Sequence, residues 1–101
     1  MWHRADGNIE GREGLRRSMR ARPPGLFVRH VITNLRASIL SPSEAVVESY
    51  VTVYRHDLKT EPVLPLKLEA PVLFGRYSDK LRNAEGAWLI VDRRVTVEMA
   101  K

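Results

Sequence analysis

The most regular feature of the chain is an alternation of apolar and polar residues that begins after Gly25 and continues almost to its last residue. A period of two residues is typical of half-buried β-strands, and these segments are rich in Val, Ile, Thr and Tyr. Turn residues interrupt the pattern at Ser41-Pro42-Ser43-Glu44 and at Asn83-Ala84-Glu85-Gly86, where we expect a type I turn followed by a left-handed glycine in a three-residue loop. The pattern therefore predicts four strands, over about residues 26–39, 45–56, 71–83 and 87–98, with a long irregular connection where three prolines follow residue 57.

The residues before the strands show a helical spacing of apolar side chains instead of alternation. Leu15 and Met19 stand four residues apart, and Pro23-Pro24 cannot continue a helix. We expect a helix over about residues 11–22, whereas residues 1–10 are too polar and glycine-rich to form an element by themselves. One N-terminal helix before consecutive antiparallel strands predicts an α+β fold, and residues 1–101 are expected to form a single domain.

The parity of the strands predicts which side chains share a face. If the first hairpin is centred on Pro42, paired residue numbers sum to about 84, so His30 lies opposite Tyr54. One face then carries polar and aromatic side chains, which line a small-molecule pocket: His30, Ile32, Asn34, Tyr50, Thr52, Tyr54 and His56. The other face is apolar and packs internally or between subunits: Val31, Thr33, Leu35, Val47, Val51 and Val53. A register slip of one residue would exchange the two sets relative to the helix.

The last strand changes phase along its length. Trp88 and Ile90 share one parity, and Val95 and Val97 share the other. A β-bulge produces such a break and lets a sheet bend strongly, so the sheet is expected to curl around a cavity. Trp88 is expected to anchor the core, because its ring is large and apolar.

Composition excludes several classes of protein. The sequence has 44% hydrophobic and 29% charged residues and no cysteine, which excludes a disordered chain, disulfides, thiolate metal sites and a cysteine nucleophile. A reducing, cytoplasmic setting follows, and no apolar run is long enough to span a membrane. The net charge of +5 resides entirely in residues 1–36, on and around one helix, which argues against a nucleic-acid-binding surface. The three histidines lack the spacing of a metal site, so no metal is expected.

Several segments, in order, resemble SnoaL-like proteins of the nuclear transport factor 2-like superfamily. They are Arg29-His30-Val31-Ile32-Thr33-Asn34, Ser49-Tyr50-Val51-Thr52-Val53-Tyr54-Arg55, Gly75-Arg76-Tyr77-Ser78-Asp79, Gly86-Ala87-Trp88-Leu89-Ile90 and Arg93-Arg94-Val95. The resemblance covers about residues 8–99 and implies a cone-like fold, a strongly curved antiparallel sheet with helices, in a homodimer or homotrimer. It also implies a lyase, isomerase or hydratase that needs no cofactor and acts on a small hydrophobic or aromatic ligand. His30 and His56 match the histidine pair of scytalone dehydratase, a member of this superfamily.

Several alternatives stay open beside this interpretation. The resemblance begins at the family's third helix, so the chain is expected to lack the first two helices and the catalytic aspartate, which leaves a truncated gene product or an open cone. His30 is then a general base or a hydrogen-bonded pocket residue without chemistry, and His56 a supporting group or an exposed loop residue. The alternative function is a structural or interaction subunit resembling the β subunit of ring-hydroxylating dioxygenases. In both cases we expect self-association through the Val-rich face of the sheet.

Overall fold

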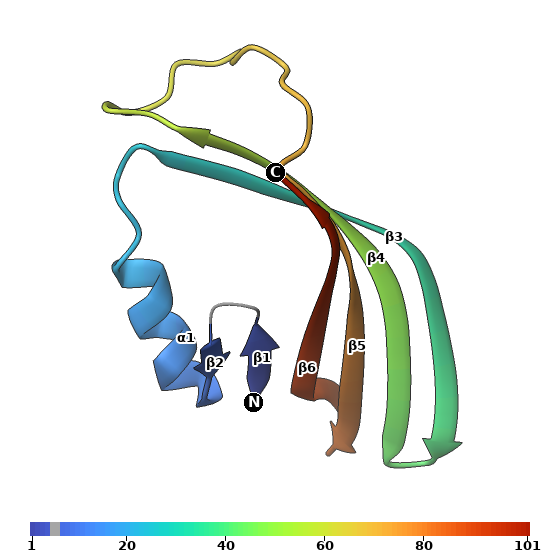
Figure 1. Cartoon of the computed structure of the whole chain (residues 1–101). Coiled ribbons are helices and arrows are strands. Elements are labelled where there is room, and N and C mark those ends of the chain that lie inside the picture. Colours follow the sequence, from blue (N-terminus) through green and yellow to red (C-terminus); the bar gives the residue numbers. More distant parts are fainter. Residues whose placement is uncertain (5–6) are drawn as a thin grey trace.

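The structure, a computed structural model, describes residues 1–4 and 7–101. These residues form one helix and a six-stranded sheet in the order β2-β1-β6-β5-β4-β3 (Figure 1). The elements are β1 (Trp2–Arg4), β2 (Gly7–Ile9), α1 (Gly11–Arg20), β3 (Leu26–Ser41), β4 (Glu44–Asp57), β5 (Leu73–Ala84) and β6 (Ala87–Ala100). All neighbouring strands are antiparallel except β1 and β6, which run parallel. The predicted α+β fold with a curved antiparallel sheet is confirmed.

The N-terminal residues differ from the prediction. Residues 1–10, expected to form no element, contribute β1 and β2, which add two three-residue strands beyond β6 to the four predicted strands. The backbone N–H of Arg93 donates to the carbonyl oxygen of Met1 over 2.8 Å, which ties the chain start to β6. Strands of three residues are too short to show a period in the sequence. β1 is held by pairing with β6, and β2 by pairing with β1.

The helix is shorter than predicted. It ends at Arg20, and the backbone N–H groups of Ala21 and Arg22 close the last turn on the carbonyl oxygens of Arg17 and Met19. Arg22 therefore lies in the turn before Pro23 rather than on the helix. α1 buries none of its residues completely and is too short and polar to cross a membrane.

The register of the first hairpin was predicted wrongly by one residue over most of its length. His30 pairs with Val53 rather than with Tyr54, and paired numbers reach the expected sum of 84 only between Arg36 and Ile39. The register shift lies between Thr33 and Arg36, where Asn34 adopts a φ of 54°. Asparagine tolerates this left-handed conformation better than other non-glycine residues, so a bulge forms there and displaces every pair beyond it.

The corrected register fixes which residues share a face. We call the face turned toward α1 the concave face and the opposite face the convex face. Three rows of directly paired residues cross the concave face: His30-Val53-Leu73-Ala100, Ile32-Val51-Gly75-Val97 and Ala37-Val47-Asp79-Arg93. A fourth row near the hairpin tips, the end row, is Ile39-Ala45-Leu81-Ile90. The residues of the predicted Val-rich face therefore lie on both sides of the sheet. Val47, Val51 and Val53 lie on the concave face, whereas Val31 and Thr33 lie on the convex face.

Two bulges bend the sheet on its β6 side. The β5–β6 pairing shifts between Lys80 and Leu81, which leaves Val91 unpaired, and again between Phe74 and Gly75. The predicted bulge in the last strand is therefore present. The turn before β6 differs from the prediction: Ala84 pairs with Ala87, so only two residues, both with positive φ, form a type I′ loop.

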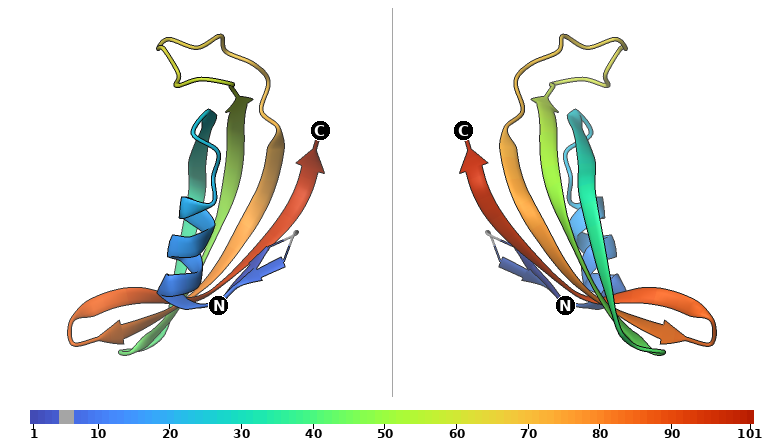
Figure 2. Two further views of the ribbon diagram at one scale, coloured as in Figure 1. Left: turned by 90° about the vertical axis from the view of Figure 1, so that its left-hand side faces the viewer. Right: turned by 90° about the vertical axis from the view of Figure 1, so that its right-hand side faces the viewer.

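The sheet arches over α1 at one end, and its two long hairpins continue past the helix at the other (Figures 1 and 2). The radius of gyration is 15.6 Å, against about 12.7 Å for a compact chain of this length. The buried apolar residues of the described chain are Ala45, Val51 and Tyr77. Trp88, expected in the core, is 41% exposed because it lies near the hairpin tip beyond the reach of α1. Much of the concave face is consequently open.

Candidate functional site

A pocket of about 380 Å³ opens on the concave face between the sheet and the C-terminal part of α1. This volume lies in the range of small-molecule sites, roughly 300–1,000 Å³. Its walls are mainly aliphatic side chains from β3, β4, β5 and β6 and from the residue before β5: Leu26, Val28, Val51, Val53, Val72, Leu73, Val95 and Val97. The polar or aromatic side chains around these walls are Trp2, Arg4, Ser18, Arg22, His30, Arg55 and Tyr77. The pocket therefore combines aliphatic walls with several polar and charged groups.

His30 contributes the imidazole of this pocket. It lies in the row that continues through Val53, so an ionisable ring is placed among aliphatic side chains. Partial burial of the ring lowers the His30 pKa below its usual value of 6.5, and the positive charges of Arg22, Arg93 and Arg4 lower it further. The imidazole is accordingly neutral at pH 7 and able to accept a proton.

A charged cluster supports the sheet next to the pocket. Arg93 donates from Nε to Oδ1 of Asp79 over 2.7 Å and from a terminal nitrogen to Oδ2 over 2.9 Å. Its guanidinium carbon lies 4.1 Å from the ring centroid of Tyr77 and 5.9 Å from that of Trp2. Burial raises the Tyr77 pKa, an effect that Arg93 opposes and Asp79 reinforces. Tyr77 is thus an uncharged side chain that lines the pocket, and it packs against Arg93, whose charge is balanced by Asp79.

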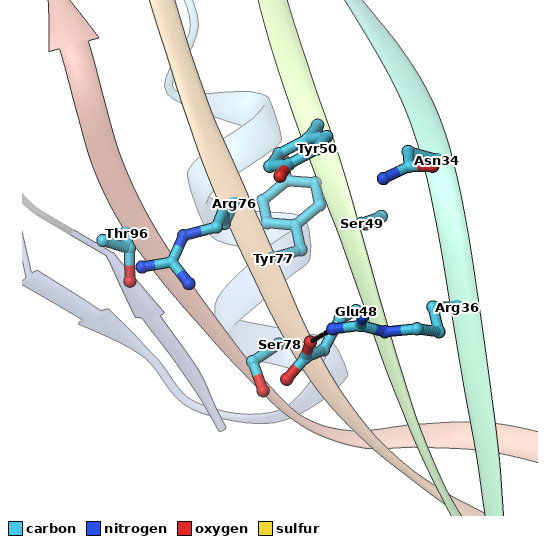
Figure 3. A pocket seen from close by; sticks show the side chains of 9 residues that line it. All are labelled: Asn34, Arg36, Glu48, Ser49, Tyr50, Arg76, Tyr77, Ser78 and Thr96. Atoms are coloured by element: carbon cyan, nitrogen blue, oxygen red, sulfur yellow. Dashed lines mark hydrogen bonds and ion pairs between the residues drawn. The ribbon is translucent and has the colours of Figure 1, made fainter.

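The convex face carries a smaller hollow of about 150 Å³, shown in Figure 3 with α1 behind the strands. Asn34 and Tyr50 line it, together with two charged side chains that pair with each other, Arg36 and Glu48, at 2.6 Å. The Tyr50 ring lies 5.4 Å from that of Phe74. Since the space is small and its charges are matched by neighbours, it offers less room for an organic molecule than the concave pocket.

A third hollow of about 410 Å³ lies under the connection between β4 and β5. Tyr54 and His56 line it with Phe27 and the connecting residues 64–70. The His56 ring nitrogen Nε2 lies 2.9 Å from the carbonyl oxygen of Lys67, which fastens the connection to β4. His56 therefore has a structural partner on the connecting segment.

The predicted site residues do not form one surface. His30 lines the concave pocket and Ile32 lies in the next concave row, whereas Asn34, Tyr50, Thr52, Tyr54 and His56 belong to the convex side. His30 and His56 thus reach different pockets on opposite faces of the sheet. In the described part of the chain, no group of three His, Asp or Glu side chains could hold a metal ion.

The sequence interpretation missed the arginines of the concave pocket. The sequence predicts Arg22 on the helix and Arg4 in a segment without secondary structure. The signal for Arg22 is Pro23-Pro24, since the residue before a proline avoids the helical conformation and the last helical turn must end earlier. Arg4 offers no such signal, because its place depends on the parallel pairing of β1 with β6.

Comparison with known proteins agrees with this geometry. The family profile described as SnoaL-like domain matches residues 1–94. A solved structure, a protein of unknown function with a cystatin-like fold from Nostoc punctiforme PCC 73102, is similar with a TM-score of 0.71 and 22% sequence identity. The alignment covers 96% of this chain but 66% of that protein, and this likeness concerns the fold alone. No curated protein matches the sequence.

Proposed function

Because the chain belongs to the SnoaL-like domain family, we propose that its concave pocket binds a small, largely apolar or aromatic molecule. The observation that carries this proposal is one neutral imidazole in an aliphatic hollow of about 380 Å³. Burial of apolar ligand surface against Val28, Val53 and Val97 would supply most of the affinity, at roughly 25 cal/mol per Å² before the costs of association.

His30 is the proposed base of a cofactor-independent lyase, isomerase or hydratase reaction. A neutral imidazole in the pocket can remove a proton from a carbon next to a carbonyl group, and the resulting imidazolium can protonate a hydroxyl leaving group. The neighbouring guanidinium groups favour the negative charge that develops on the substrate oxygen in such a step. His56 stands outside this reaction, because its ring lies on the other face and contacts Lys67.

The proposal is tested by a thermal-shift screen of hydrophobic and aromatic molecules, followed by His30→Ala on each hit. His30→Ala should abolish turnover of any substrate and weaken binding of its ligand severalfold. The matched control is His3→Ala, which removes an imidazole that lies 3.0 Å from Asp92 and is not among the residues that line the pocket. Unchanged turnover and affinity in His30→Ala would refute the site assignment.

Uncovered apolar surface supports self-association, which we expect whether the chain is a ligand-binding protein or a structural or interaction subunit. In the end row, Ile39 is 67% and Ile90 is 52% exposed, and Trp88 beside them is 41% exposed. The accessible surface of the chain is 7731 Å², whereas a compact protein of this mass has about 5,800 Å². The excess accessible surface of the chain is similar to the area that one subunit buries in a large protein–protein interface. We therefore propose that a second or third copy covers the end row, which gives a homodimer or homotrimer.

Sedimentation of the protein at tens of micromolar tests this assembly. Ile90→Lys should shift the oligomer to monomer, because a lysine ammonium would have to leave water in the interface. Val63→Lys is the control, since Val63 is 83% exposed in the connection between β4 and β5, far along the chain from the end row. A monomeric wild type would remove the assembly proposal and leave the pocket proposal standing. A cytoplasmic location and a single domain over residues 1–101 complete the proposal.

A further inference from the structure

The charged side chains among the described residues that line the concave pocket all have one sign. They are three arginines, Arg4, Arg22 and Arg55, and no described lining residue is Asp or Glu. They come from three places in the chain: β1, the turn after α1, and the end of β4. A concave site lined by one sign of charge concentrates ions of the opposite sign, since the surrounding apolar walls screen the field poorly.

The protein neutralises these charges unequally. Arg55 is paired with Asp57, whose oxygens lie 3.0 and 3.2 Å from its guanidinium nitrogens. Arg93, behind the pocket, is paired with Asp79. Arg22 forms no ion pair with any carboxylate of residues 1–4 and 7–101 in this structure. Partial burial is the main cause of the lowered His30 pKa, and the positive charge of Arg22 is the next cause, ahead of Arg93 and Arg4, so the Arg22 guanidinium acts electrostatically on the imidazole of this pocket.

We propose that the ligand of the concave pocket is an organic anion, a molecule with an apolar or aromatic body and one carboxylate, and that Arg22 is the residue that selects the carboxylate. This inference rests on the proposed function and adds the ligand's charge to it. A guanidinium binds a carboxylate through two parallel N–H···O bonds, which neutral isosteres cannot reproduce. The aliphatic walls formed by Val28, Val53 and Val97 would contact the apolar body.

A carboxylate beside Arg22 has a consequence at His30. Burial is the main cause of the lowered imidazole pKa, and a carboxylate offsets the second cause, the positive charge of the arginines, so binding of an anionic ligand should raise that pKa. A neutral ligand of the same shape would exclude water without supplying charge and should leave the pKa depressed. A rise of the His30 pKa on binding therefore indicates that the pocket recognises the ligand's charge, and an unchanged, lowered pKa indicates that it only buries the ligand's apolar surface.

The test uses two probes of the same shape, 1-naphthoate and 1-naphthamide, in calorimetric titrations of the full chain at 20 mM and 300 mM NaCl. 1-Naphthoate should bind at least tenfold more tightly than 1-naphthamide at low salt, and this advantage should shrink at high salt. Arg22→Gln should reduce the advantage about five- to tenfold without changing the affinity for 1-naphthamide. Arg17→Gln on α1 removes the same charge from outside the lining residues and should preserve the advantage. Titration of the His30 ring resonances by NMR should show a raised pKa with 1-naphthoate only.

Each outcome decides a different point. Equal affinity for the two probes would overturn the inference about charge while supporting the apolar pocket. An equal loss in Arg17→Gln and Arg22→Gln would overturn the role of Arg22, because general surface charge would then explain the binding. Inorganic phosphate that displaces 1-naphthoate at equal concentration would overturn the amphipathic ligand. Failure of both probes to bind at millimolar concentration would count against the proposed function itself.

Discussion

The pair formed by Asp79 and Arg93 is the clearest place to test how this thin core is stabilised. Asp79 is 4% exposed and accepts two hydrogen bonds from Arg93, its direct partner across β5 and β6. In Asp79→Asn the shape of the side chain is kept, but the guanidinium loses its counter-charge. Removing one partner of a buried ion pair costs about 3–5 kcal/mol.

The expected loss here is smaller than that range. The Arg93 side chain is 27% exposed, so water solvates part of the orphaned charge, and the asparagine oxygen retains one acceptor. We therefore expect Asp79→Asn to lower the free energy of unfolding by about 2–3 kcal/mol. For a domain of this length such a loss lowers the Tm by about 10–20 °C. Urea denaturation followed by circular dichroism measures both the midpoint and the slope.

Two further variants make the result interpretable. Glu48→Gln breaks the exposed Arg36–Glu48 pair, whose side chains are 78% and 53% exposed, and should cost less than about 0.5 kcal/mol. The double variant Asp79→Leu/Arg93→Met removes both charges and should be more stable than Asp79→Asn, since no charge is left unpaired. A loss in Asp79→Asn no larger than in Glu48→Gln would refute the reasoning, as would a double variant less stable than the single one.

Three other predictions address the pocket, a close backbone approach and the connecting segment. The folded-state pKa of His30 lies below 6.5, so the imidazole takes up a proton more readily in the unfolded chain, and the free energy of unfolding of the wild type should fall as the pH drops below about 7. Urea midpoints at pH 7.5 and 5.0 measure this fall, and in His30→Asn the part that is due to His30 should be absent. Gly25→Ala should cost at least about 2 kcal/mol, because a Cβ would collide with the carbonyl group of Leu58; an unchanged urea midpoint would contradict it. His56→Ala removes the bond to Lys67 and should speed amide exchange in residues 58–72 several-fold while costing about 1 kcal/mol; unaltered exchange there would show that the connection is held by other contacts.

Local signals predicted the long elements of the fold. The alternation of Val, Tyr and Thr placed four strands to within about two residues, because each strand has 12 residues or more and its period shows over that length. The two turns were located by their proline and glycine residues. The second turn was given the wrong type, since the positive φ of Glu85 is imposed by the pairing of Ala84 with Ala87 rather than by its own side chain.

The faces of the first hairpin could not be predicted from its turn alone. Counting residue pairs outward from Pro42 gives the correct register only as far as the bulge at Asn34. Beyond it every predicted pair is displaced, so His30 lies opposite Val53 instead of Tyr54. Asparagine is depleted in strands and tolerates the left-handed conformation, but nothing in the residues next to Asn34 marks it as left-handed.

The bulge at Asn34 also explains why His30 is chemically distinctive. Without the shift, the imidazole would join the polar and aromatic residues of the convex side, where amide and phenol groups could solvate it. With the shift it enters the aliphatic row of Val53 and Leu73, under arginines contributed by segments on either side of α1. Partial burial and the positive charges of Arg22, Arg93 and Arg4 lower the pKa of His30 in this hollow, and this combination of a perturbed pKa and a concave position is the reason that we propose His30 for binding or proton transfer.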